Sequence, residues 1–244
     1  MSVRSGLKLL AARAVGAPAL FVYESRRRRL ANRYLSGSGL EVGALHRPLR
    51  VPRKANVRYV DRMGTAVLRR EYPELAAEPL VEVDVIDDGE TLATQADGSA
   101  DFIIANHFIE HTQDPIGTIA NHLRVLRPGG VLYMAVPDRR HTFDVDRAGT
   151  PLEHVIRDRR EGPSWSRPIH QEEWARLVEK VPAGEVERRV AQLEESDYSI
   201  HFHAWTLDEF AELLRHARED EHLPFALDAL TPNQHEFIAI LRRV

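Results

Sequence analysis

The chain of 244 residues contains no cysteine. Disulfide bonds, thiolate zinc sites and cysteine nucleophiles are therefore excluded, and a reducing, cytoplasmic location is expected. Long hydrophobic runs are also lacking, because none approaches the roughly 20 apolar residues of a membrane-spanning helix. The formal net charge is −4. Without an excess of basic residues, a nucleic-acid partner is not expected.

Residues 1–37 are expected to form a basic helical segment. Lys8 and Arg13 interrupt the apolar stretch at the start, which argues against a cleaved signal peptide. Further on, apolar and aromatic residues recur at helical spacing around a basic run. They are Leu20, Tyr23, Leu30 and Tyr34, with Arg26 to Arg29 among them. Two interpretations stay open: the helix packs on the domain, or it contacts a membrane surface or an anionic partner.

From residue 38 onward, apolar runs typical of strands alternate with helical patterns. The expected strands are 40–43, 57–61, 81–86, 101–106, 131–136, 225–230 and 236–241. Asp114-Pro115 is a typical helix start, and Thr206 with Glu209 forms a capping-box pattern. Strands that alternate with helices pair in parallel through right-handed crossovers. We expect one α/β domain over 38–244, with a doubly wound, mostly parallel, seven-stranded sheet closed by a hairpin.

Residues 139–200 differ from the rest, since they are polar and have no strong strand pattern. We interpret them as a mostly helical insertion after the fifth strand, which forms a lid or an acceptor wall.

Polar residues stand where the expected strands end. Ligands of an open parallel sheet bind at the carboxyl ends of its strands. Gly43 lets the backbone approach a ligand closely, and the Asp61 carboxylate suits the two hydroxyl groups of a ribose. The other strand ends carry Glu41, Asp87 or Asp88 with Gly89, and Asn106 with His107.

The same runs resemble the class I S-adenosylmethionine (SAM)-dependent methyltransferases of the type 11 group. The resemblance covers roughly residues 38–140 and rests on Leu40–Gly43, Asp61, Asp88–Leu92, Asp101–His111 and Leu126–Leu132. It implies that SAM is the cofactor, and that Glu41, Gly43, Asp61, Asp88, Gly89, Asn106 and His107 lie at its site. The family's first loop usually has several glycines, whereas this loop keeps only Gly43. A nicotinamide dinucleotide is disfavoured, because its pyrophosphate needs the missing glycine-rich turn.

Histidines provide the candidate catalytic groups. His141 follows the fifth strand and is our expected general base, with Asp138 to orient it and His111 as the alternative. The run His107-Phe108-Ile109-Glu110-His111 also matches the H-x-x-E-H pattern of inverted zinc proteases. That chemistry needs both histidines on one helix, whereas this run directly follows a buried strand.

A magnesium ion is a second hypothesis, with Glu110, Asp138 and Asp144 as its oxygen ligands. His201 and His203 would point to one side if their segment is extended, and would line the acceptor site or pack beside Trp205. His170 and Trp174 suggest the same wall.

The expected acceptor is a sugar hydroxyl on an oligo- or polysaccharide, such as a mannoside, in a protein of bacterial type. Two alternatives stay open: a methyltransferase for a small natural product, and an inactive scaffold that keeps the SAM fold. A homodimer is compatible with the sequence, which does not settle the oligomeric state.

Overall fold

The computed structural model describes residues 17–75 and 77–244, so the expectations for residues 1–16 lie outside the described part. Seven strands form one sheet in the order β3-β2-β1-β4-β5-β7-β6. Their bounds are β1 Gly37–Val42, β2 Ala55–Asp61, β3 Val85–Ile86, β4 Ala100–Asn106, β5 Leu126–Pro137, β6 Phe225–Asn233 and β7 Glu236–Arg243. All neighbours from β3 to β5 pair in parallel, while β7 is antiparallel to β5 and β6. The expected doubly wound α/β fold with a closing hairpin is confirmed.

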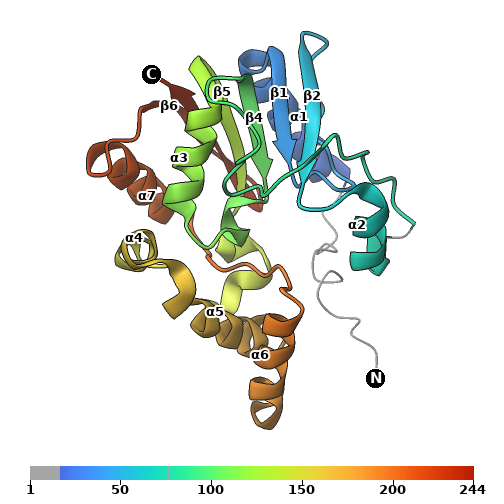
Figure 1. Ribbon diagram of the computed structural model, residues 1–244, viewed down its shortest axis with the longest axis vertical. Coiled ribbons are helices and arrows are strands. Elements are labelled where there is room, and N and C mark those ends of the chain that lie inside the picture. Colours follow the sequence, from blue (N-terminus) through green and yellow to red (C-terminus); the bar gives the residue numbers. More distant parts are fainter. Residues whose placement is uncertain (1–16, 76) are drawn as a thin grey trace.

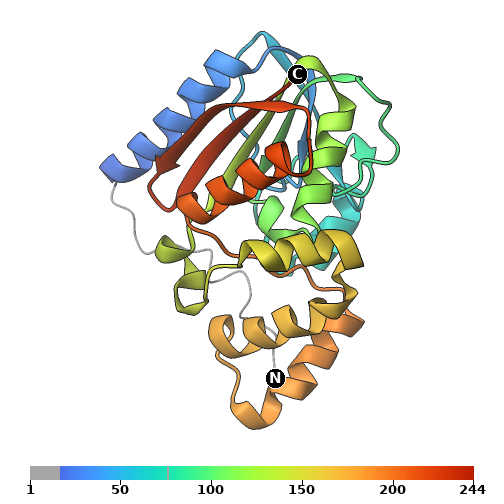
Figure 2. The ribbon, with the colours of Figure 1, turned by 90° about the vertical axis from the view of Figure 1, so that its left-hand side faces the viewer.

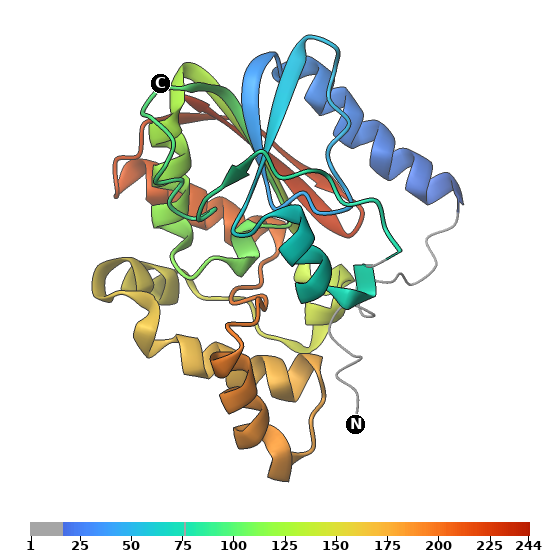
Figure 3. The ribbon, with the colours of Figure 1, turned by 45° about the vertical axis from the view of Figure 1, so that its right-hand side comes forward.

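Helices cover both faces of this sheet (Figure 3). They are α1 Ala17–Tyr34, α2 Thr65–Glu71, α3 Pro115–Val125, α4 Leu152–Glu161, α5 Arg167–Glu173, α6 Val186–Glu195 and α7 Leu207–Glu219. Alternate residues of β4 show the division: Ile103 belongs to the core shared with α3 and α7, while Phe102 and Ile104 belong to the core shared with α1. A parallel strand buried on both faces is apolar along its buried stretch, as β4 is from Phe102 to Ala105.

The helix starts read from the sequence are confirmed. Asp114 accepts a hydrogen bond from the amide of Gly117, with Pro115 in the first turn of α3. Thr206 and Glu209 form the capping box of α7. These caps satisfy amide groups that have no partner within the helix, so each helix begins at a fixed residue.

Two strand expectations need correction. The strand expected over 81–86 shortens to Val85–Ile86, because residues before it bond to loops instead: the amide of Val81 donates to Leu45, and that of Val83 to the Thr65 hydroxyl. Conversely, β5 already begins at Leu126, which pairs with Ala100 across an irregular register. The strand expected over 131–136 is thus longer and includes residues 127–130.

Helix α1 packs on the sheet through the buried side chains of Ala31 and Leu35. Its Arg27 is buried and forms a salt bridge to Glu236 of β7, with 2.5 Å between Nη2 and Oε2. The first of the two interpretations, packing on the domain, therefore describes this part of the segment. No helix among the described residues is long and apolar enough to cross a membrane.

The insertion after β5 is mostly helical, as expected, and contains α4, α5 and α6. Figures 1 and 2 show these helices beyond the edge at which β4 and β5 end, away from the sheet itself. The insertion thus borders the edge where the candidate site residues meet.

Candidate active site

A cleft lies at the carboxyl ends of the parallel strands, between the sheet and the insertion. Its lining includes most of the residues expected from the sequence: Glu41, Gly43, Asp61, Asp88, Gly89, Asn106, His107, His111 and His141. Glu110, Asp138 and Asp144 are buried beside it and do not line it.

Glu41 holds the loop that follows β1. Its Oε1 accepts a hydrogen bond of 2.8 Å from the amide of Leu49, while Oε2 is buried without a hydrogen-bond partner among the described residues. Burial raises the pKa of Glu41 to about 7. Gly43 then turns the chain with φ of 65°, a left-handed conformation that favours glycine. The loop is therefore fixed by one carboxylate although it has a single glycine.

Asp61 ends β2 with its carboxylate half-buried at the cleft. Its Oδ1 accepts a hydrogen bond from the amide of Arg62, and burial raises the pKa of this aspartate. The Arg62 guanidinium is directed elsewhere, to Glu71 at 3.5 Å and Asp197 at 3.6 Å. Asp61 thus keeps acceptor capacity toward the cleft.

The loop after β3 has two adjacent aspartates with different roles. Asp87 is buried and accepts from the Thr94 hydroxyl at 2.6 Å, so its carboxylate holds the loop. Asp88 is exposed and caps the amide of Glu90 at 2.7 Å through Oδ1. A Cβ at Gly89 would lie 2.5 Å from Val42 and 2.6 Å from Phe108, so only glycine fits there. Asp88 and Gly89 line the cleft together with Asp87 and Glu90 of the same loop.

At the end of β4, Asn106 and His107 are held by different strands. The side-chain oxygen Oδ1 of Asn106 accepts a hydrogen bond of 3.1 Å from the main-chain amide of Ala135. The side-chain nitrogen Nδ2 of Asn106 is buried without a partner in the described part of the chain. His107 has φ of 50°, and its Nε2 lies 2.8 Å from Oε2 of Glu236. The ring of His107 is thereby oriented by a carboxylate from β7.

Glu236 is a site residue that sequence reasoning missed. Besides His107 it accepts hydrogen bonds from Tyr23, Arg27 and Asn233. Burial alone would raise its pKa, but the hydrogen bonds and charge of Arg27 hold the pKa of Glu236 well below its usual range. The available signal in the sequence was that Glu236 is a charged residue at the start of the apolar run 236–241. This signal does not reveal partners that are so distant in the sequence.

Glu110 lies at the base of the cleft in a short turn, Ile109–His111. Its Oε1 is 3.8 Å from Nδ1 of His107 and 3.9 Å from Nε2 of His201. Burial raises the pKa of Glu110 well above its usual range. Only Ile109–His111 of the H-x-x-E-H run are helical, as a single 3-10 turn, so His107 and His111 do not share one α-helix, and this argues against the protease interpretation.

His111 and His201 form the wall on the insertion side. Nδ1 of His111 donates to the carbonyl of Ile200 at 2.9 Å, and burial lowers the pKa of His111 to about 3. His201 bonds Asp144 at 2.7 Å, and Arg147 bonds the same carboxylate at 2.8 Å. Although burial opposes it, His201 and Arg147 lower the pKa of Asp144 to about 2.

The expected pairing of Asp138 with His141 is not found. Asp138 is buried and binds the Arg140 guanidinium through both oxygens, at 2.9 and 2.6 Å. His141 has an exposed side chain on the cleft, and its amide donates to the Asp138 carbonyl at 2.8 Å. Asp138 therefore fixes the turn that carries His141, while Arg140 takes its carboxylate.

The three carboxylates expected to hold magnesium do not come together as one group. Among the described residues, side chains with donor atoms within 4.8 Å of one another form two groups. The first is Glu110, His111 and His201; the second is His154, Asp158, His170 and His203. Asp138 and Asp144 are in neither group, and they pair instead with Arg140 and Arg147.

His201 and His203 were expected on one side, but they belong to different groups. Residues 200–205 are irregular, so the alternation of an extended strand does not apply. His203 stacks on Trp205 with ring centres 5.2 Å apart. His170 and Trp174 are buried and do not line the cleft.

Comparison with known proteins agrees with this architecture. A family model described as a methyltransferase domain matches residues 23–217. A SAM-dependent methyltransferase from Aquifex aeolicus superposes with a TM-score of 0.50 at 13% identity, covering 93% of this chain and 94% of its own. A Rhodobacter sphaeroides structure, provisionally described as Zn-dependent alcohol dehydrogenases, gives 0.54 at 15% identity, covering 91% and 88%. At these identities the likeness to solved structures shows the fold alone. A search of curated proteins finds no match.

Proposed function

This chain belongs to the methyltransferase-domain family and uses S-adenosylmethionine, and from that premise we propose that it methylates a sugar hydroxyl of an oligo- or polysaccharide. The observation that carries the proposal is the cleft itself. One side has free polar groups at the strand ends, and the other has histidines, arginines and aromatic rings of the insertion.

The residues on the strand side fit SAM. Among the buried atoms at the cleft that have no hydrogen-bond partner within the described residues are Glu41 Oε2, an acceptor, and Asn106 Nδ2, a donor. Buried polar atoms in native proteins are normally paired, so these two suit the ammonium and carboxylate groups of a bound ligand. Asp61 would hold the ribose hydroxyls, and Asp88 with Gly89 would border the adenine. When bound, SAM supplies a methyl group on a positively charged sulfonium.

His141 is the general base in this proposal. Transfer to an aliphatic hydroxyl requires that the proton leaves as the oxygen attacks, and an imidazole suits this at neutral pH. His141 is exposed to the cleft on a turn fixed by Asp138. His111 is the weaker candidate, because a pKa of about 3 makes its imidazole a poor proton acceptor. A base is most effective when its pKa lies near the working pH.

The insertion side suits a hydroxyl-rich acceptor. Phe143 and Phe202 line this side of the cleft, and the guanidinium groups of Arg167 and Arg189 line it as well. Aromatic faces stack on sugar rings, while guanidinium groups bind hydroxyl and carboxylate oxygens. The experiment below also tests whether the acceptor is a molecule smaller than an oligosaccharide.

The test is calorimetric titration of SAM followed by transfer of labelled methyl to a panel of oligosaccharides and small phenols. We expect SAM to bind and a glycan to be labelled. For His141→Ala, we expect turnover to fall about 10²- to 10⁴-fold with SAM affinity unchanged. His222→Asn removes an exposed histidine outside the cleft and is the matched control.

Three results would contradict parts of the proposal. Labelling of small phenols without glycans would replace the sugar acceptor with a natural product. Equal loss of SAM affinity and turnover in His141→Ala would make this histidine structural. Folded protein that does not bind SAM would be the inactive scaffold.

A further inference from the structure

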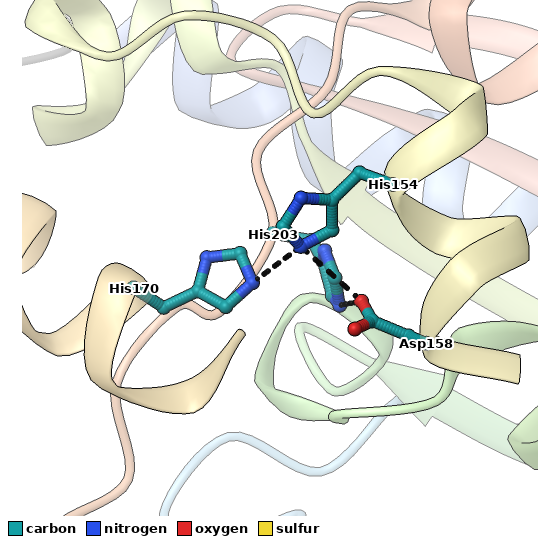
Figure 4. A group of neighbouring side chains, drawn as sticks. All are labelled: His154, Asp158, His170 and His203. Carbon is teal, nitrogen blue, oxygen red and sulfur yellow. Dashed lines mark hydrogen bonds and ion pairs between the residues drawn. The ribbon is translucent and has the colours of Figure 1, made fainter. Parts of the chain in front are cut away.

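The second group, with three histidines and an aspartate, lies between the insertion and the segment before α7, apart from the cleft. It joins three segments: His154 and Asp158 come from α4, His170 from α5, and His203 from the irregular stretch before α7 (Figure 4). Asp158, His170 and His203 are buried, with exposed fractions of 1%, 5% and 0%. None of the four lines the cleft, so the cofactor and the acceptor do not account for them.

The donor atoms of this group converge on one point. Nε2 of His154 lies 2.9 Å from Nε2 of His170 and 3.3 Å from Oδ2 of Asp158. Nε2 of His203 lies 3.9 Å from the same carboxylate oxygen. Four ligands at about 2.0–2.1 Å from a tetrahedral ion lie about 3.3–3.5 Å from one another. Figure 4 shows the rings of His154 and His170 turned toward each other beside Asp158.

The carboxylate of Asp158 is half satisfied. Its Oδ1 accepts from the hydroxyl of Ser166 at 2.6 Å, which fixes the orientation of the group. Its Oδ2 is buried without a hydrogen bond from any residue the structure describes. An unpaired buried carboxylate oxygen is costly, and a cation between it and the three imidazoles would remove that cost. The Ser166 contact is the kind of outer-shell bond that orients metal ligands.

We propose that His154, Asp158, His170 and His203 form a structural zinc site that joins α4, α5 and the segment before α7. Three imidazole nitrogens with one carboxylate favour zinc, whereas magnesium and calcium take mostly oxygen ligands. All four ligands come from the protein and the group is buried, as in closed structural sites. The site lies next to the cleft wall, because His203 follows directly after His201 and Phe202.

The first experiment measures the metal content of the full chain, produced with zinc in the medium, by mass spectrometry. We expect about one zinc per chain, and a tetrahedral absorption spectrum after exchange for cobalt(II). Asp158→Asn and His203→Gln should reduce the zinc content to near zero. His111→Gln is the matched control, because it disrupts the other group of possible ligands and should keep the zinc.

A second measurement uses the unaltered chain, so it does not depend on whether the variants fold. Removal of zinc by a chelator should lower the melting temperature by roughly 5–10 °C, and zinc but not magnesium should restore it. Folded chain that holds no zinc and gains no stability from it would overturn the proposal. Loss of zinc in His111→Gln with retention in Asp158→Asn would also overturn it, by moving the metal to the cleft. Neither measurement involves SAM, so the outcome is independent of the methyltransferase proposal.

Discussion

The sheet and the insertion are each stabilised by a different kind of contact. The sheet has an apolar core on each face, with Ile103, Leu132 and Phe237 on one side and Phe102 and Tyr133 on the other. The insertion has a small apolar cluster: Trp174, Val178, Leu193, Ile200 and Phe202. Its centre is instead polar, with Arg147, Asp144 and the histidine groups buried among its helices. A unit too small for a large apolar core depends on directional contacts, and such contacts also fix the wall of a site.

Arg147 provides the strongest test of this contrast. Its buried guanidinium bonds Asp144 at 2.8 Å, Glu173 at 2.7 Å and two backbone carbonyls of residues 201 and 202. Arg147→Ala would leave the buried carboxylate of Asp144 without its guanidinium partner, and we expect it to lower the free energy of unfolding by about 3–5 kcal/mol. Urea denaturation measures this. Arg176→Ala, which removes an exposed pair with Glu172, should cost less than about 1 kcal/mol. Equal effects of the two variants would show that the insertion does not depend on its polar centre.

At the strand ends that line the cleft, we expect single side chains to affect the affinity for SAM strongly and the stability of the fold little. Asp61→Ala removes charge-assisted hydrogen bonds to the ribose, and we expect SAM affinity to fall about 10- to 100-fold. The melting temperature should change little, because the side chain is half-buried and its bond to Arg62 is local. Calorimetry with Asp97→Ala as the control measures this, since Asp97 is exposed and paired with Arg124 outside the cleft. Unchanged affinity in Asp61→Ala would remove this residue from the cofactor site.

The smallest expected effect concerns pH. Burial raises the pKa of Glu41 to about 7, above the ordinary value of 4.5 expected in the unfolded chain. The folded state therefore holds this proton more tightly, and the stability it contributes is lost as pH rises through 7. Between pH 6.5 and 8 we expect Glu41 to lower the free energy of unfolding by about 1 kcal/mol. Urea denaturation of Glu41→Gln at both pH values should show this loss removed.

A second carboxyl titrates in the same range, because burial raises the pKa of Glu90 to about 7 as well. Glu90→Gln serves as the comparison. This variant should remove only the part of the pH dependence of the free energy of unfolding that comes from Glu90. If Glu41→Gln and the unaltered chain lost equal stability between the two pH values, the pKa of Glu41 would lie at its usual value.

The strand side could be predicted from the sequence because its signals are local. Apolar runs mark β4 and β5, Asp114-Pro115 marks the start of α3, and parallel pairing brings the strand ends to one edge. The strand expected over 81–86 was too long because side-chain and loop bonds compete for its backbone, and no local pattern shows that competition.

The insertion could not be predicted in the same detail, since its contacts join residues that are far apart in the chain. Arg147 reaches carbonyls more than fifty residues away, and His154 meets His170 only because two helices are packed together. The pairing of Asp138 with Arg140 rather than His141 is local, but it depends on which of two adjacent cations reaches a buried carboxylate. Histidine and arginine content indicated a polar wall without indicating its partners.

The contact between Glu236 and His107 has a consequence for the order of synthesis. These residues are 129 positions apart, and Glu236 also binds Tyr23, 213 positions before it. A ribosome must therefore deliver β7 before α1 and the end of β4 can be joined by one carboxylate. Until then the nascent chain can build its parallel strands in order, but it lacks the group that orients His107. The cleft is thus completed only when β7, the last strand of this sheet, has been made, so a chain truncated before β7 would lack a finished site even with every cofactor-facing residue present.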